Sequence, residues 1–253
     1  MILRLLSAAL AAGFLAAVVA TGLQVALTSP LIIEAERYES GTAHSAALPL
    51  APAHFEGALL HRAHLHLAHG GESHDHGGAP AWQPGEGLPR ILFTGLATLV
   101  GGVGYALLLG AVMLALRRDP TPERALAFAV AGFVSVGLAP ALGLPPELPG
   151  SEAAPLATRQ AWWLMTALAT GMGLYLIAIR RAAVTILGGL VLIVAPHIAG
   201  APEVAAAKSD LPAGLAAQFA ARSLAVGFVF WAVIGLSFGW AWQVFGRERP
   251  IRV

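Results

Sequence analysis

Residues 91–116 read ILFTGLATLVGGVGYALLLGAVMLAL, a run without a single Lys, Arg, Asp or Glu. A helix needs about 20 apolar residues to cross about 30 Å of hydrocarbon, so this run is long enough to span a membrane. Five further apolar windows lie at residues 5–27, 125–142, 161–179, 182–198 and 219–245. The window at 182–198 is short, with Pro196 at its end. The sequence therefore predicts an all-α, polytopic helical membrane protein with about six transmembrane helices.

The composition of the whole chain agrees with this class. Of 253 residues, 57% are hydrophobic and 11% are charged, and the mean hydropathy is +0.72, values typical of a protein in a bilayer. The net charge of +1 and the scattered basic residues give no indication of nucleic-acid binding. Cysteine is absent, so any metal site must use nitrogen and oxygen ligands.

The distribution of Arg and Lys predicts the orientation. If the N-terminus is cytoplasmic, nine arginines close to helix ends lie inside, whereas the six basic residues outside are mostly spread over longer loops. Residues 1–253 then form a single transmembrane domain with both termini cytoplasmic, and residues 28–90 form a flexible, His-rich extracytoplasmic loop. The first window could instead be a signal peptide cleaved after Ala20, which would leave five helices. Its apolar run continues to about Leu27, which favours a retained helix.

The predicted outer loop concentrates histidine. Eight of the nine histidines lie between His44 and His76, with acidic residues among them. Neutral imidazole is a preferred ligand of Co, Ni, Cu and Zn, so we expect the tract to capture a divalent metal, although a merely solvated loop is the alternative. The expected ligands are His64, His66, His69, His74, Asp75 and His76. Their spacing does not match a fixed structural zinc site, which indicates weak, exchangeable binding.

Three residues at the outer helix ends are candidates for passing the ion into the bundle: Glu34, His197 and Glu203. Pro140 precedes an acid, Glu147, by the same spacing that separates Pro196 from Glu203. This pattern indicates either an internally repeated hairpin whose acids share a vestibule, or only the frequent use of proline where helices end. The alternative for His197 is an ordinary packing role.

The spans hold no buried carboxylate, and the chain has no G-x-x-x-x-G-K-[ST] loop. Both features argue against a proton-coupled carrier or an ATP-driven pump within this chain. No zinc-protease motif and no acid/base pair at depth suggest catalysis, so we expect no enzyme activity and no catalytic cofactor.

The chain resembles the CbtA family of predicted cobalt transporter subunits over nearly its whole length. The residues that carry the resemblance are 30–39, 74–77, 143–150, 159–163 and 195–202. The resemblance implies a bacterial inner-membrane protein that transports Co²⁺, has a link to cobalamin biosynthesis, and works with a small His-bearing companion subunit called CbtB. The residues alone do not choose between cobalt, nickel and zinc, and a metal sensor or scaffold without its own conduit is an alternative function.

Overall fold

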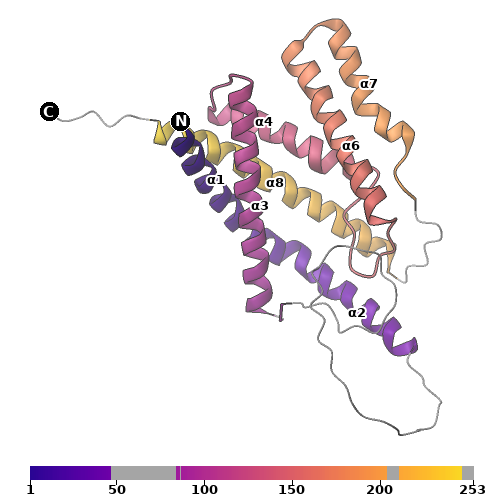
Figure 1. The fold of residues 1–253 in the computed structure, drawn as a ribbon. Helices are drawn as coiled ribbons and strands as arrows, with labels where there is room; N and C mark the ends of the chain where they lie inside the picture. The colour runs from indigo at the N-terminus through magenta and orange to yellow at the C-terminus, as the bar shows by residue number, and fades with distance from the viewer. Residues whose placement is uncertain (47–83, 86, 204–210, 247–253) are drawn as a thin grey trace, which may run out of the picture.

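A computed structural model describes residues 1–46, 84–85, 87–203 and 211–246. Over these ranges the chain is built of helices alone, which confirms the predicted all-α class (Figure 1). Five helices are long and apolar enough to cross a membrane: Ile2–Tyr38, Leu88–Ala115, Pro122–Ala141, Leu156–Arg180 and Ala213–Phe245. They correspond to five of the six predicted windows. The window at 182–198 forms a shorter helix.

The first helix is continuous through three segments: α1 (Ile2–Leu23), the π-helical η1 (Gln24–Thr28) and α2 (Ser29–Ala46). Its described apolar part, Ile2–Tyr38, is 37 residues and so about 55 Å long, well beyond the thickness of the hydrocarbon. The prediction that the helix stops near Leu27 is therefore wrong, and residues 29–46 of the predicted loop are helical. The wider π-helical turn accommodates Pro30, whose missing N–H and bulky ring would otherwise disturb the turn before it.

Three long helices form the main core. α3 (Leu88–Ala115) and α8 (Ala213–Phe245) both pack on α1, and α8 also packs on α4 (Pro122–Phe133). Gly102 of α3 lies so close to Gly13 of α1 that an added Cβ would stand 2.9 Å from the Gly13 carbonyl oxygen. Met113, Ile234 and Phe238 are fully buried at the centre of this core.

The third span continues α4 through η2 (Val134–Leu138) and α5 (Ala139–Ala141). The fourth span is α6 (Leu156–Tyr175) followed by η3 (Leu176–Arg180), which turns into α7 (Ala183–Ala199). Here α7 packs on α6 and η3 at the edge of the bundle, where Gly173 and Gly189 face each other (Figure 1).

Two details of α7 bear on the predicted fifth span. Its 17 residues make it about 25 Å long, shorter than a typical hydrocarbon core. It does not end at Pro196 but continues to Ala199, because a proline near the C-terminus removes only one hydrogen bond, while the Gly200 N–H still donates to the Pro196 carbonyl at 3.2 Å.

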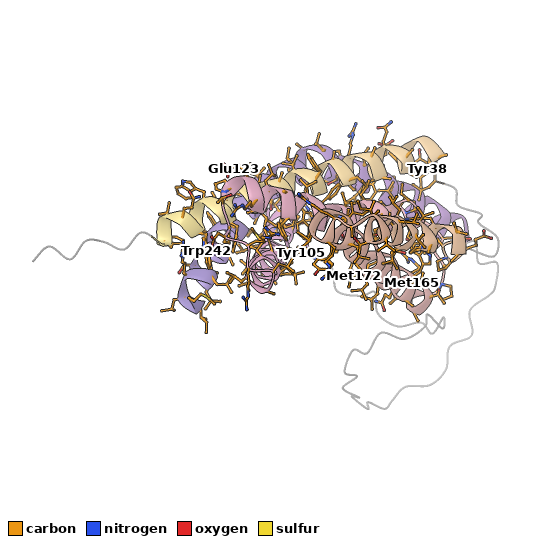
Figure 2. All side chains as sticks on the ribbon, turned by 90° about the horizontal axis from the view of Figure 1, so that it is seen from above. Tyr38, Tyr105, Glu123, Met165, Met172 and Trp242 are labelled. Carbon is orange, nitrogen blue, oxygen red and sulfur yellow. The ribbon has the colours of Figure 1, made fainter. Side chains whose placement is uncertain are left out.

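The bundle has two distinct ends. At the first, which we call the termini end, Arg4 Nε donates to the Trp242 carbonyl at 2.8 Å and the guanidinium lies 4.2 Å from the Trp242 ring centroid. At the other, the loop end, Leu31, Leu148 and Leu215 are buried against one another. Figure 2 shows Glu123 and Trp242 toward one end and Tyr38 toward the other. The side of the membrane that each end faces stays a prediction.

Candidate functional site

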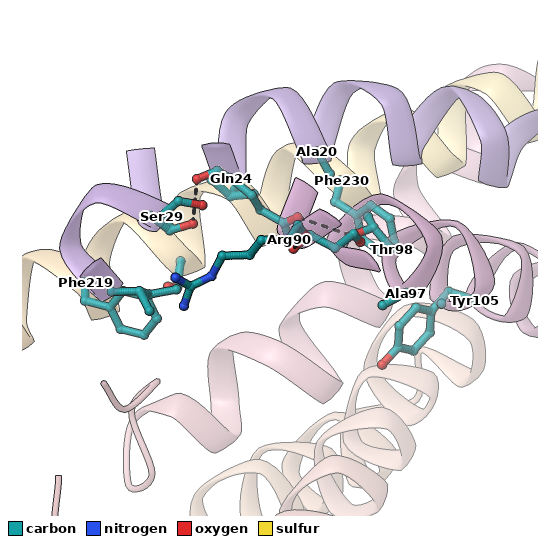
Figure 3. Close-up of a pocket in the computed structure, with 16 residues that line it drawn as sticks. Ala20, Gln24, Ser29, Arg90, Ala97, Thr98, Tyr105, Phe219 and Phe230 are labelled. Atoms are coloured by element: carbon teal, nitrogen blue, oxygen red, sulfur yellow. Dashed lines mark hydrogen bonds between the residues drawn. The ribbon is translucent and has the colours of Figure 1, made fainter. Parts of the chain in front are cut away.

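A cavity of about 490 Å³ lies between the first helix, α3 and α8, in the half of the bundle nearer the loop end (Figure 3). Seven of its lining residues carry a side-chain oxygen, and we call it the hydroxyl cavity: Gln24, Thr28, Ser29, Thr94, Thr98, Tyr105 and Ser223. Arg90 is the one charged residue in this lining, as far as the described part of the chain extends. The cavity therefore combines neutral oxygen ligands with one cation.

A hydrogen bond between two helices crosses this cavity. Thr98 Oγ1 donates to Gln24 Oε1 at 3.1 Å or, alternatively, to the Thr94 carbonyl at 2.7 Å (Figure 3). Thr28 Oγ1 donates to the Gln24 carbonyl at 3.0 Å, and Thr94 Oγ1 donates to the Arg90 carbonyl at 2.8 Å. Hydroxyls that donate to their own helix keep oxygen lone pairs as acceptors, so this wall offers acceptor groups that suit a cation.

The π-helical turn explains why these residues reach the cavity. Gln24 and Thr28 are the first and last residues of η1, two residues before Pro30. Such turns often occur at functional sites because they shift side chains out of the regular helical register. The Leu27 carbonyl in this turn accepts a hydrogen bond from Arg222 Nη1 of α8 at 3.1 Å, which ties the opened turn to the neighbouring helix.

A second cavity of about 530 Å³ lies between α5, α6 and α8. Four residues line both cavities: Tyr105, Ser223, Gly227 and Phe230. The rings of Tyr105 and Phe230 meet edge to face with centroids 6.3 Å apart. The two cavities are thus neighbours, separated by an aromatic pair and by a position of α8 that has no side chain.

Each cavity is associated with one Arg–Glu ion pair. Arg90, which lines the hydroxyl cavity, pairs with Glu36 of α2. Arg159 and Glu147, which both line the second cavity, pair at 2.7 Å between Nη2 and Oε2. The four side chains are 28–35% exposed, so water reaches both pairs. Sequence reasoning singled out Glu147 as a candidate vestibule acid but assigned Glu36, Arg90 and Arg159 to no site, because spacing along the chain does not reveal which charges meet.

The structure describes three of the predicted metal-binding residues, Glu34, His197 and Glu203. The tract residues His64, His66, His69, His74, Asp75 and His76 lie outside the described residues. Glu34 is exposed on α2, and Glu203 is exposed just after α7. Over the described ranges, no group of three His, Asp or Glu side chains gathers as a metal site, so the structure does not bring Glu34, His197 and Glu203 into one centre.

His197 has the most distinctive surroundings of these candidates. Its ring meets the buried Trp162 ring edge to face, with centroids 6.0 Å apart. His197 Nε2 and Trp162 Nε1 are both buried and have no hydrogen-bond partner within the described structure. Its packing against Trp162 agrees with the alternative role expected for this histidine. An unpartnered imidazole nitrogen also keeps the ligand role chemically open.

The fold and its cavities define a class: a multi-pass helical membrane protein with polar cavities inside the bundle. The family model described as "Probable cobalt transporter subunit (CbtA)" matches residues 2–243, and the chain belongs to this family. This agrees with the resemblance noted in the sequence. No curated protein and no solved structure matches the chain significantly.

Proposed function

We propose that this chain is the membrane subunit through which divalent cobalt is taken up, with the ion captured on the His/Asp tract and passed through the hydroxyl cavity. Family membership makes the chain a subunit of a probable cobalt transporter. The observation that carries the finer proposal is the hydroxyl cavity itself, a group of oxygen-bearing side chains inside an otherwise apolar bundle. Polar groups at this depth are costly and commonly mark ion pathways.

The cavity has room for a hydrated ion. Six waters occupy about 180 Å³ at about 30 Å³ each, well below the cavity volume of about 490 Å³. Cobalt would exchange part of its water for Gln24 Oε1 and the threonine hydroxyls without being fully stripped. Neutral oxygen ligands hold such an ion weakly, and weak binding is what allows an ion to leave again.

The Arg90–Glu36 pair supplies a gate in this proposal. The positive charge of Arg90 repels a divalent cation, and the Glu36 carboxylate offsets part of that charge. An arriving ion would attract the Glu36 carboxylate and compete with Arg90 for it. The pair therefore sets the electrostatic barrier at the loop end, with Glu34, His197 and Glu203 as further predicted contacts on the route.

The proposal includes the cellular setting. The protein would lie in the bacterial inner membrane with both termini cytoplasmic and the tract outside, and would function with a CbtB-like companion subunit. In this role it has no enzyme activity and no catalytic cofactor, Co²⁺ is its substrate, and its link to cobalamin biosynthesis is the supply of cobalt.

Uptake of labelled cobalt into proteoliposomes tests the proposal, with Ni and Zn as competitors and with or without the companion subunit. Gln24→Leu removes one of the oxygen ligands from the cavity, and we expect cobalt flux to fall at least tenfold, which corresponds to a barrier about 1.4 kcal/mol higher. Gln243→Leu is the matched control because Gln243 is exposed at the termini end. The proposal fails if no divalent ion crosses in either case. Metal binding by the tract without flux would support a sensor or scaffold.

A further inference from the structure

A third cavity, of about 470 Å³, lies between α3, α4 and α6. Its lining is almost wholly apolar, and we call it the apolar groove; Leu108, Val112 and Leu168 in this lining are 40–65% exposed. The groove is therefore open sideways, toward the space that lipid occupies around a membrane-spanning bundle. Neither Arg–Glu pair touches it, and the proposed cobalt route does not use it.

The length of the groove matches one leaflet of a bilayer. Along α6 and η3 it extends from Leu168 to Ile179, about 17 Å at 1.5 Å per residue. Half of a hydrocarbon core of about 30 Å is about 15 Å. An acyl chain lying in the groove would therefore bring its headgroup to the level where the helices end.

Two arginine pairs stand at that level. The lining residue Leu116 is followed by Arg117 and Arg118, and the lining residue Ile179 is followed by Arg180 and Arg181. All four arginines are exposed, and the two ion pairs found in the described ranges lie at the loop end and involve other arginines. The described residues of the termini end hold six arginines against two acids, Asp119 and Glu123. This end of the groove is thus strongly positive.

The backbone at both pairs is unusual. Arg117 and Arg181 have φ values of 53° and 57°, and they are the non-glycine residues with positive φ in the described part of the chain. Both follow a helix C-terminus, where glycine usually takes this conformation at lower cost. The Arg118 N–H donates to the Met113 carbonyl at 2.8 Å, which closes the end of α3. Backbone strain is thus present at an arginine just after the end of each of these two helices, and such strain is often associated with function.

We propose that the apolar groove and the arginines at 117–118 and 180–181 form a binding site for an anionic phospholipid. One acyl chain lies in the groove, and the phosphate is held by guanidinium groups, which bind phosphate oxygens through paired N–H donors. Basic clusters between membrane helices select anionic headgroups on the same physical basis. This site is distinct from the route proposed for cobalt, and its test does not depend on transport.

The headgroup part of the proposal is tested by native mass spectrometry of the full-length protein in detergent, titrated with phosphatidylglycerol or phosphatidylcholine of the same acyl chains. The unsubstituted protein is expected to prefer phosphatidylglycerol. Arg180→Gln with Arg181→Gln should weaken phosphatidylglycerol binding about 25-fold, from about fivefold for each basic residue, and weaken phosphatidylcholine binding far less, because the choline cation offsets the charge of its phosphate. Arg180→Lys with Arg181→Lys keeps the charge and should keep the preference.

The acyl-chain part is tested by filling the groove. Ala178 lines the groove and is exposed, so Ala178→Phe can occupy the space without disturbing the core. Ala111 is also exposed on the same half of the bundle but does not line the groove, which makes Ala111→Phe the matched control. We expect Ala178→Phe to reduce the retention of both lipids about tenfold or more, while Ala111→Phe has no effect.

Three results would overturn the site. Equal binding of the two lipids to the unsubstituted protein would contradict the preference for an anionic headgroup. Unchanged phosphatidylglycerol binding in the Gln variant would show that Arg180 and Arg181 do not hold the headgroup. Equal effects of Ala178→Phe and Ala111→Phe would show that the groove holds no specific acyl chain and that the retained lipid merely surrounds the bundle. Inorganic phosphate, added in excess, should displace no lipid, and displacement would show that the arginines bind free phosphate instead.

Discussion

Glu36→Gln is the substitution that most directly tests whether cobalt passes through the hydroxyl cavity. It removes the carboxylate that pairs with Arg90 and changes the net charge of this pair from zero to +1. One added unit of positive charge about 8 Å from a divalent ion raises the repulsion by about 1 kcal/mol at a dielectric constant of 80, and by about 4 kcal/mol at 20. Because both side chains are about one-third exposed, the lower figure applies. We therefore expect uptake to slow about fivefold.

The assay is the initial rate of labelled cobalt uptake into proteoliposomes at low ionic strength. Glu36→Gln combined with Arg90→Gln restores neutrality and should restore most of the rate, whereas Arg90→Gln alone leaves a negative charge and should raise it. The differences should shrink between 0.01 and 0.15 M salt, because the screening length falls from about 30 Å to about 8 Å.

Glu147→Gln is the matched control, since it breaks the corresponding pair with Arg159 at the second cavity. We expect it to change the rate much less than Glu36→Gln does. The reasoning is refuted if Glu36→Gln has no effect, if the double variant is as slow as Glu36→Gln, or if Glu147→Gln alone slows uptake.

The remaining predictions concern packing and metal capture. Gly13→Val should lower the free energy of unfolding by about 1–3 kcal/mol through overpacking, because a Cβ there would stand 2.5 Å from the Val103 backbone nitrogen; Gly104→Ala has open space and should change it little. Thermal unfolding in detergent measures both, and equal melting temperatures would contradict the packing. Deleting residues 61–76 should slow uptake severalfold at limiting cobalt but not at saturation, which a concentration series checks. A slower rate at saturation would contradict a capture role.

The spans were predictable because an uncharged run is a property of the sequence alone. The bounds near Leu27 and Pro196 were not. The first helix continues past Pro30 through a π-helical turn, and α7 continues past Pro196 because a proline so close to the C-terminus removes only one hydrogen bond. The ends of a helix depend on how the chain relaxes around such a residue. Pattern reasoning therefore locates apolar helices better than it locates where they stop.

The candidate site also has features that the sequence reveals and features that only the packing of the helices reveals. Thr94 and Thr98 lie four positions apart in the sequence, about one helical turn, but only the packing of the helices brings Thr98 to Gln24. Arg90 and Glu36 are separated by 54 positions in sequence, so no local pattern could pair them. The His tract, in contrast, is recognised from composition alone, because clustered histidines indicate metal binding. Its role as a set of metal ligands stays a prediction, since it lies outside the described residues.

The two cavities beside α8 are each bordered by a π-helical turn followed by a proline. Pro30 and Pro140 each lie two residues past a π-helical turn, η1 and η2. Each opened turn offers a carbonyl to a side chain of another helix, since Arg222 binds the Leu27 oxygen and Trp163 Nε1 binds the Val136 oxygen at 3.2 Å.

The acids follow these prolines at different distances, so the proline and its π-helical turn are the feature that the two spans have in common. Each turn widens its helix beside a cavity, and the Tyr105–Phe230 pair separates the two spaces. The aromatic pair therefore keeps the proposed ion route in the hydroxyl cavity apart from the second cavity and its Arg159–Glu147 pair, which is why Glu147→Gln serves as the control for Glu36→Gln.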